Sequence, residues 1–245
     1  MQQLWPHNTV DALGENELEE LYRYPKSRWL AVNFVSTVDG AMEIAGHSAG
    51  ISTAPDRVVY QLGSDLADVV LLGAGTATIE QFHGIRPTEQ TRHRRERHRL
   101  SPVPPIAVVS TGPSLPPDAP VLTDVLTPSI VLTCTAAPQS LREAWAEAGA
   151  TVLVAGEDTV DLSAAVAALH EQDLGRIDCE GGPQLLGSLL SAGLVDELRL
   201  TLSPLLASGT SGRIATGLPI DPARLTLASV LTKDDTLMLR YLVHD

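Results

Sequence analysis

The chain has 245 residues, of which 44% are hydrophobic and 19% charged, a composition typical of a folded globular protein. Its formal net charge of −13 argues against non-specific nucleic-acid binding, which needs Lys and Arg to neutralise phosphates. No apolar run reaches the roughly 18 residues of a membrane helix, and the opening MQQLWP lacks the basic and apolar regions of a signal peptide. We therefore expect a cytoplasmic protein with no membrane partner.

Short apolar runs alternate with helix-like segments along most of the chain. The acidic stretch at residues 15–20 predicts the outer face of an N-terminal helix that ends before Pro25. Predicted strands follow, most of them continuously apolar, at 29–35, 69–73, 106–110, 130–133, 151–154, 176–180 and 197–203. Continuously apolar strands are typical of a largely parallel sheet with helices on both faces.

The segments between these strands carry helix signals. Thr53, with Asp56 three residues later, predicts the capped start of a helix over 57–67. Gly149 and Gly193 mark helix ends, since glycine is favoured just past a C-terminus. Further helices are therefore predicted over 141–147, 162–172 and 183–193.

The end of the chain differs from a plain doubly wound pattern. Two predicted strands, 225–231 and 237–243, flank the polar stretch TKDDT and predict a β-hairpin. A mostly parallel sheet that ends in an antiparallel hairpin favours a dihydrofolate-reductase-like, three-layer α/β/α fold. We expect a single domain over 1–245, with an N-terminal extension at 1–28 that holds a short helix and a core at 29–245.

Two strands run through glycines directly into a predicted helix, the position where α/β sheets bind ligands. The first passes through Gly73, Gly75 and Thr76, and the second through Glu180, Gly181 and Gly182. Glycine lets the backbone approach a ligand closely, and free N–H groups at a helix start favour phosphate. Each junction alone could be a tight turn, but two in one sheet favour a dinucleotide site.

A third strand ends at Ser36 and leads to Asp39 and Gly40. Asp39 could be part of a simple turn, or it could be a carboxylate that faces a heteroaromatic substrate. Glu180 has the same two interpretations: a solvated carboxylate, or a partner for the N–H groups of a heterocycle.

Other polar groups indicate no separate site. The basic run at 92–99 holds five arginines and predicts a solvated, mobile face, although it could attract an anionic substrate or a cofactor phosphate. Cys134 and Cys179 lie in apolar runs and are expected to be free, buried thiols. The histidines at 47, 83 and 170 lack metal-ligand spacing, so we expect no metal. With no nucleophile set either, the pattern suits a reaction whose chemistry a cofactor carries.

Read in order, STVDG (36–40), ADVVLLGAGT (67–76) and EGGP (180–183) followed by GLVDEL (193–198) resemble the reductase domain of the riboflavin-biosynthesis deaminase–reductase family. The resemblance extends from Trp29 to the C-terminus. It implies a dihydrofolate-reductase-like fold, NADPH as hydride donor and a homodimer. It also implies a reaction, the reduction of the ribose of a 5-amino-6-(5-phosphoribosylamino)uracil to its ribityl form.

The same resemblance implies the site residues. Those for NADPH are Gly73, Gly75, Thr76, Glu80, Thr111, Gly181, Gly182, Gln184 and Leu185. Those for the substrate are Ser36, Asp39, Arg86 and Glu180, of which Asp39 and Glu180 are the candidate catalytic residues. The proton donor is left open between these two carboxyl groups and a water molecule.

Some positions depart from the family pattern. The segment QFHGIR at 81–86 differs from the usual approach to the substrate arginine, and the zinc motifs of a deaminase are absent, so only the reductive half of the pathway step is expected. Two alternatives therefore stay open. One is a reductase of dihydrofolate, another pteridine or another heterocycle, and the other is a non-catalytic NADPH-binding protein.

Overall fold

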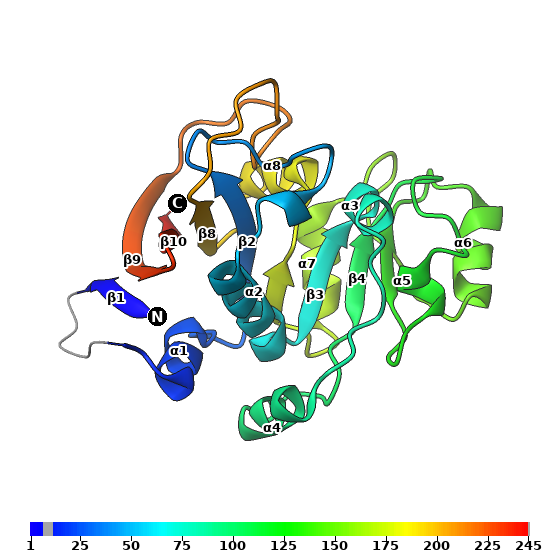
Figure 1. The fold of residues 1–245 in the computed structure, drawn as a ribbon. Coiled ribbons are helices and arrows are strands. Elements are labelled where there is room, and N and C mark those ends of the chain that lie inside the picture. The colour runs from blue at the N-terminus through cyan, green and yellow to red at the C-terminus, as the bar shows by residue number, and fades with distance from the viewer. Residues whose placement is uncertain (7–11, 245) are drawn as a thin grey trace.

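A computed structural model describes residues 1–6 and 12–244. The strands are β1 (Gln2–Trp5), β2 (Trp29–Thr37), β3 (Val69–Gly73), β4 (Ile106–Val109), β5 (Ile130–Thr133), β6 (Thr151–Val154), β7 (Arg176–Cys179), β8 (Glu197–Ser203), β9 (Arg224–Lys233) and β10 (Thr236–His244). They form one sheet in the order β1-β9-β10-β8-β2-β7-β3-β4-β5-β6 (Figure 1).

The strands from β8 to β6 in this order are parallel, while β10 is antiparallel to both β8 and β9. The predicted mostly parallel sheet with an antiparallel C-terminal hairpin is therefore confirmed. Strand β1 was not predicted: it pairs with β9, with Gln2 opposite Thr232. Its four residues are too few to show the alternation by which a strand is recognised.

The helices are α1 (Glu15–Tyr22), the 3-10 turn η1 (Ser48–Gly50), α2 (Ala54–Leu66), α3 (Ala74–Ile79), α4 (Glu89–Arg97), α5 (Pro120–Thr123), α6 (Gln139–Glu147), α7 (Leu162–His170) and α8 (Pro183–Ser191). The predicted cap of α2 is present, because the Thr53 hydroxyl accepts the Asp56 N–H at 3.3 Å. Helices α4 and α5 were not predicted, because α4 is strongly polar and α5 has only four residues.

Alternate residues of the central strands enter separate cores. On β3, Val69 and Leu71 pack with α7 and α8, whereas Val70 and Leu72 pack with α3, α5 and α6. Helices α1 and α2 cover the face of the sheet towards which Val70 and Leu72 point. They lie over the end of the sheet that holds β2, β9 and β10, and they contact Ala31 of β2. The three-layer α/β/α fold is confirmed, and both cysteines are free and buried, as predicted.

The expectation of a solvated, mobile basic run is wrong for its middle. Arg94 and Arg95 of α4 are buried. Arg94 donates to Glu19 at 3.0 Å, to Glu15 at 2.6 Å and to Asp65, while Arg95 donates to the backbone carbonyls at the end of α2. Glu19, expected on the outer face of its helix, is only 6% exposed. Arg94 and Arg95 thus join α4 to α1 and α2, and we call these contacts the clamp between α1, α2 and α4. No sequence pattern indicated the clamp, because the partners of the two arginines lie far away along the chain.

A second buried ionic cluster joins the hairpin to the rest of the sheet. Glu197 of β8 is fully buried, and its Oε1 accepts from Arg199 at 2.9 Å and from Arg240 at 2.7 Å. Its Oε2 accepts from the Trp29 indole at 3.1 Å. Burial alone would raise the pKa of Glu197, but the two arginine charges and their hydrogen bonds lower it to about 2.

We predict that Glu197→Gln destabilises the protein by about 3–5 kcal/mol, because it leaves two buried guanidinium groups without their counter-charge. The wild-type pKa lies below the ordinary value of 4.5. The contribution of Glu197 is thus present above pH 4.5 and is lost as pH falls towards 2, a loss that the variant should lack. Urea denaturation over this pH range measures both effects.

The matched control is Glu20→Gln. Glu20 pairs with Arg23 at 2.8 Å, but the two side chains are 66% and 56% exposed, so the free energy of unfolding should barely change. Equal effects of the two substitutions would contradict the role given to Glu197.

Candidate active site

Two strand–glycine–helix junctions lie against each other at the carboxyl edge of the sheet. The Gly73 N–H at the end of β3 donates to the Gly181 carbonyl after β7 at 2.8 Å. A Cβ on Gly182 would stand 2.4 Å from the Thr76 hydroxyl of α3, and a Cβ on Gly181 would stand 3.1 Å from the Phe34 ring. Only glycine permits so close an approach, so these residues determine how the two junctions pack.

A cleft of about 770 Å³ opens at these junctions. Residues 73–76 and 182–185 line the cleft, and Ser110, Thr111 and Ser114 line it near the end of β4. A Cβ on Gly75 would meet no atom within 4 Å, so the backbone here is open to a ligand. The predicted cofactor residues that line this cleft are Gly73, Gly75, Thr76, Thr111, Gly182, Gln184 and Leu185.

A second cavity, of about 390 Å³, shares Thr76, Ile79 and Gly182 with the cleft, so the two adjoin. Glu180 lines this second cavity at the end of β7, and Tyr60 lines it from α2. We call the two spaces the long cleft and the inner cavity. The inner cavity joins apolar walls to several ionisable groups, which suits a polar heterocycle.

Glu180 stands between the inner cavity and a buried carboxyl group. Burial raises the pKa of Glu180 well above its ordinary value, and the Asp178 charge and the hydrogen bond with Asp178 raise it further. Oε1 of Glu180 and both carboxylate oxygens of Asp178 have no hydrogen-bond donor among the described residues when both groups are ionised. One proton shared by the two carboxyl groups would supply the missing donor, and the raised pKa of Glu180 favours placing it there.

Sequence reasoning missed several polar residues of the inner cavity, among them Asn33, Asp56 and Arg57. Asn33 is buried in β2, and its Nδ2 has no acceptor within the described part of the chain, which leaves a donor for a ligand. A polar residue inside the apolar run 29–35 was the available signal. Arg57 adds a cation at the start of α2, where it donates to the Ser52 carbonyl at 3.1 Å.

Two predicted site residues lie elsewhere or act differently. Arg86 is bonded to Asp124 and lines neither the long cleft nor the inner cavity. Glu80, expected beside the cofactor, lines the inner cavity instead, and its Oε1 accepts from the N–H and the hydroxyl of Ser48 at 3.0 and 3.1 Å. Glu80 thereby holds the segment between β2 and α2 at the cavity.

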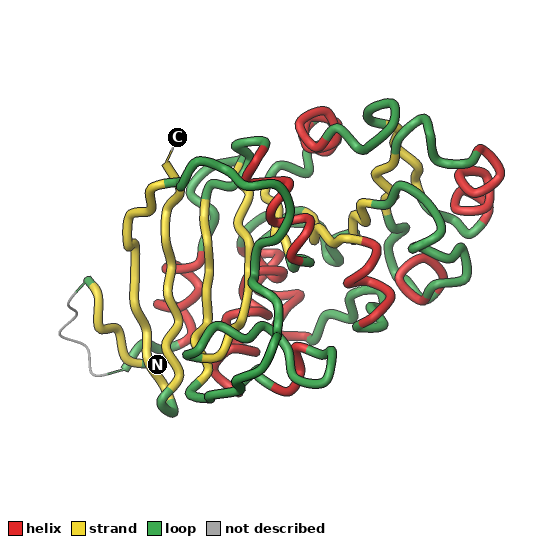
Figure 2. The backbone as a smooth tube through the Cα atoms, turned by 90° about the horizontal axis from the view of Figure 1, so that it is seen from above, coloured by secondary structure: helices red, strands yellow, loops and turns green. Residues whose placement is uncertain are grey.

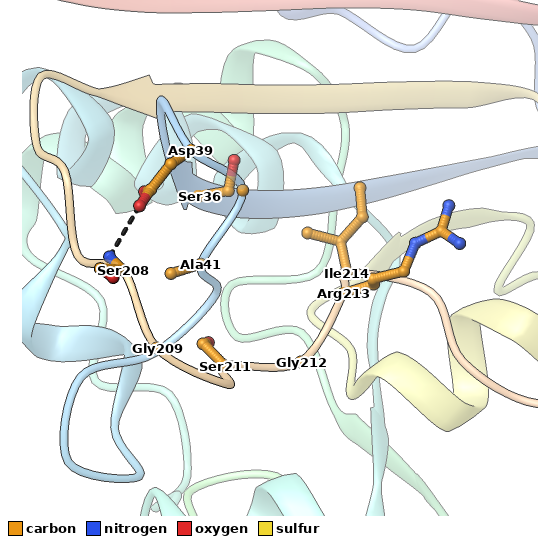
Figure 3. Close-up of a pocket in the computed structure, with 10 residues that line it drawn as sticks. Ser36, Asp39, Ala41, Ser208, Gly209, Ser211, Gly212, Arg213 and Ile214 are labelled. Carbon is orange, nitrogen blue, oxygen red and sulfur yellow. Dashed lines mark hydrogen bonds between the residues drawn. The ribbon is translucent and has the colours of Figure 1, made fainter.

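A third cavity, of about 460 Å³, contains Ser36 and Asp39 (Figure 3). The Asp39 carboxylate accepts from the Thr37 hydroxyl and from the N–H groups of Ala207 at 3.1 Å and Ser208 at 2.7 Å. These hydrogen bonds, that of Thr37 first, lower the pKa of Asp39 to about 2. Asp39 thus holds two loops together as an ionised group, and it does not share a cavity with Glu180.

The loop after β8 forms the far wall of the third cavity and reaches the long cleft. Arg213 lines both spaces, and its side chain points away from Asp39 (Figure 3). The loop packs on α8 at Gly187, where a Cβ would stand 1.9 Å from the Thr216 carbonyl. Arg213 is the one basic residue among those that line the long cleft, and an irregular loop offered no sequence signal for it.

The described residues contain no group of three His, Cys, Asp or Glu side chains placed to hold a metal ion. In the same part of the chain, no helix is both long enough and apolar enough to cross a membrane.

The arrangement combines a cleft that can bind an anion, a carboxyl group and an amide donor. The long cleft offers glycine backbone and the start of α8 to an extended anion such as a dinucleotide. The inner cavity offers a carboxyl group with a raised pKa, Glu180, and an amide donor without an acceptor among the described residues, Asn33. Because the two spaces meet at Thr76 and Gly182, ligands in both would touch there.

Comparison with known sequences finds a match to the RibD C-terminal domain family over residues 28–239. A curated 2,5-diamino-6-ribosylamino-4(3H)-pyrimidinone 5′-phosphate reductase of Methanothermobacter thermautotrophicus is 30% identical over 225 residues, which is 88% of this chain and 98% of that protein. The protein of the same name from Archaeoglobus fulgidus is 29% identical over 183 residues, covering 74% of this chain and 82% of its own.

Comparison with solved structures finds the same fold in a pyrimidine reductase-like protein of Corynebacterium diphtheriae. The TM-score is 0.74 at 22% sequence identity, over 89% of this chain and 92% of that one.

We predict that Asp39→Ala releases the loop after β8. Without the carboxylate, the amides of Ala207 and Ser208 lose their acceptor and should exchange with solvent roughly tenfold faster. Hydrogen exchange resolved to single amides measures this. In the wild type, protection should persist from pH 7 to pH 4, because Asp39 stays ionised down to a pKa of about 2.

The control is Asp235→Ala in the exposed turn between β9 and β10, which should leave both amides unchanged. Unaltered exchange in the Asp39 variant would remove the loop-holding role.

Proposed function

The chain belongs to the RibD C-terminal domain family, and from this premise we propose that it is an NADPH-dependent reductase of a ribosylaminopyrimidine 5′-phosphate in riboflavin biosynthesis. The observation that carries the proposal is that the long cleft adjoins the inner cavity, which Glu180 lines. The reaction would open the ribose and reduce its C1′ carbon, giving the ribityl form.

The long cleft fits NADPH. Its volume of about 770 Å³ lies within the range of cofactor pockets. Gly75 leaves the backbone open, and Gly182 and Gln184 stand at the start of α8, where free N–H groups favour a pyrophosphate. Thr111 would lie near the adenosine end, and Arg213 supplies a positive charge. When bound, NADPH supplies the hydride, and the protein contributes alignment and exclusion of water.

The inner cavity would hold the pyrimidine and its ribose phosphate. Asn33 has a free N–H for a carbonyl oxygen of the heterocycle, and Arg57 is a candidate partner for the phosphate in place of Arg86, which is bonded to Asp124. The ring could be the uracil that the sequence resemblance implies or the 2,5-diaminopyrimidinone in the names of the curated relatives.

Glu180 is the proposed proton donor. Reduction of a carbon–nitrogen or carbon–oxygen double bond at C1′ adds one hydride to carbon and one proton to the heteroatom. Glu180 lines the inner cavity, and its raised pKa favours the protonated acid, which can give that proton and regain it from water. Asp39 does not suit this role, because it is ionised, bonded to the loop after β8 and absent from the inner cavity.

The experiment that tests the function is a reductase assay with the purified protein. The near-ultraviolet absorbance of NADPH should fall with the uracil substrate, the diaminopyrimidinone substrate or both, and NADH in parallel tests the cofactor preference. Dihydrofolate serves as the competing substrate. Turnover with dihydrofolate alone, or with no substrate at all, would overturn the proposal in favour of the pteridine reductase or the non-catalytic binding protein.

We predict that Glu180→Gln lowers kcat by about 10²- to 10⁴-fold, the usual contribution of a general acid, because an amide does not release the proton. The dissociation constant of NADPH should stay within about twofold, since Glu180 does not line the long cleft. Steady-state kinetics and NADPH fluorescence titration measure the two quantities.

Glu147→Gln at the exposed end of α6 is the control and should keep full activity. A Glu180→Gln enzyme with wild-type kcat would assign the proton to another donor.

We also propose a homodimer, which the family resemblance implies, formed through the outer face of the hairpin end of the sheet. One face of β9 and β10 packs on α1 and α2, and β8 bonds to α1 on the same face through Arg199. The other carries half-buried apolar rows, among them Leu200, Leu239 and Val230 side by side. Figure 2 shows these strands side by side at the left, with helices behind and to the right. A second copy would cover this face.

We predict that the wild type has about twice the 26.0 kDa chain mass in solution and that Leu239→Glu has the chain mass, because a carboxylate at the centre of this face opposes its burial. Light scattering after size exclusion measures both. Leu218→Glu, at an 85% exposed leucine in the loop after β8, should stay dimeric. A monomeric wild type would contradict the proposal.

A further inference from the structure

Beneath Glu180 lies a second carboxyl group that the proposed reaction does not itself use. Asp178 of β7 is fully buried. Strand residues two apart share a face, so Asp178 and Glu180 both point towards α2. Helix α2 makes room for them with Gly63, where a Cβ would stand 2.6 Å from Asp178 Oδ2. A buried acid beside the site acid is costly unless a charge or a proton compensates it.

Arg199 of β8 is the compensating charge. Its Nη1 lies 3.9 Å from Asp178 Oδ1 and has no hydrogen-bond acceptor in the described chain. The rest of its guanidinium is held in place, because Nε donates to Glu197 at 2.9 Å and Nη2 donates to the Tyr22 carbonyl at 3.1 Å. Arg199 is 1% exposed, so its charge acts on Asp178 with little screening by water.

The surroundings of Glu180 are different. The groups that act on it are Asp178 from its own strand and Tyr60 and Asp56 from α2, and both charged members of this set are negative. Arg57, the cation of the inner cavity, donates to a backbone carbonyl. Two adjacent carboxyl groups retain one proton between them, and the proton resides on the group with less positive charge nearby.

We propose that Asp178 and Arg199 are positioning residues that keep the proton of the carboxyl pair on Glu180. Burial raises the pKa of Asp178, and the charge of Arg199 and the hydrogen bonds with Glu180 and Tyr24 oppose that rise. Asp178 is therefore the group of the pair that ionises and accepts the hydrogen bond of the Glu180 acid. The single proton is thereby directed to the carboxyl group that faces the inner cavity. The inference rests on the proposed function, in which Glu180 gives this proton to the substrate.

The carboxyl pair of Asp178 and Glu180 also favours the return of a proton to Glu180 after each turnover. Once Glu180 has released its proton, two carboxylates face each other, and their repulsion favours uptake of a proton from water. Asp178 and Arg199 touch neither the inner cavity nor the long cleft. Their effect should therefore appear in the pH dependence of kcat and not in cofactor binding.

The test substitution is Asp178→Asn, which keeps the size of the side chain. The change removes a negative charge and an acceptor for the Glu180 proton, so Glu180 should ionise at lower pH. We expect the fall of kcat with rising pH to begin at lower pH and kcat at neutral pH to drop by about tenfold or more. The dissociation constant of NADPH should stay within about twofold.

Asp65→Asn is the matched control. Asp65 is also a carboxylate with 1% exposure bonded to a buried arginine, Arg94, but it belongs to the clamp between α1, α2 and α4. It should lower stability yet leave the pH profile of kcat in place. A profile that shifts equally in both variants, or in neither, would overturn the inference.

A second readout does not depend on activity. Carbon-13 NMR of protein labelled at glutamate carboxyls, with Glu180→Gln used to assign the resonance, follows the titration of Glu180. The resonance should titrate at lower pH in Asp178→Asn than in the wild type and be unchanged in Asp65→Asn. An unshifted titration refutes the positioning role. Absence of reductase activity in a wild type whose Glu180 titrates as described would refute the proposed function alone.

Discussion

The structure depends on one buried carboxylate, that of Glu197. It joins three strands, because Trp29 of β2, Arg199 of β8 and Arg240 of β10 all donate to it. The two arginines also donate to the last backbone carbonyls of α1, which binds the N-terminal helix to the C-terminal hairpin. Buried ion pairs contribute little net stability over apolar residues, but removing one partner is costly, so the cluster favours one arrangement of these strands over others.

This cluster also reaches the candidate site. Arg199, held by Glu197, stands 3.9 Å from Asp178, and Asp178 faces Glu180. A chain of buried charges thus runs from the hairpin to the inner cavity. It ends on Glu180, an acid that lines the inner cavity. The structural role and the proposed chemical role share residues, because the low-dielectric interior that makes the ion pairs specific also raises the pKa of Glu180.

Local patterns were sufficient for most of the fold. Continuous apolar runs located the parallel strands, Thr53 located the start of α2, and the TKDDT turn located the hairpin. The glycines at 73, 75 and 182 marked the edge of the sheet where the long cleft lies. Local patterns failed where a residue's role depends on a distant partner: Arg94 and Glu19 form one clamp although 75 positions separate them, and Arg86 is bonded to Asp124.

The order of apolar runs, glycines and caps therefore specifies the strands, the helices and the edge where ligands would bind, because those features arise from neighbours along the chain. Tertiary structure alone decided which polar groups share a space. It separated Asp39 from Glu180, brought Asn33 and Arg57 into the inner cavity, and set Arg199 beside Asp178. Protonation and pairing depend on burial and on charges from other strands, and these exist only once the sheet has assembled.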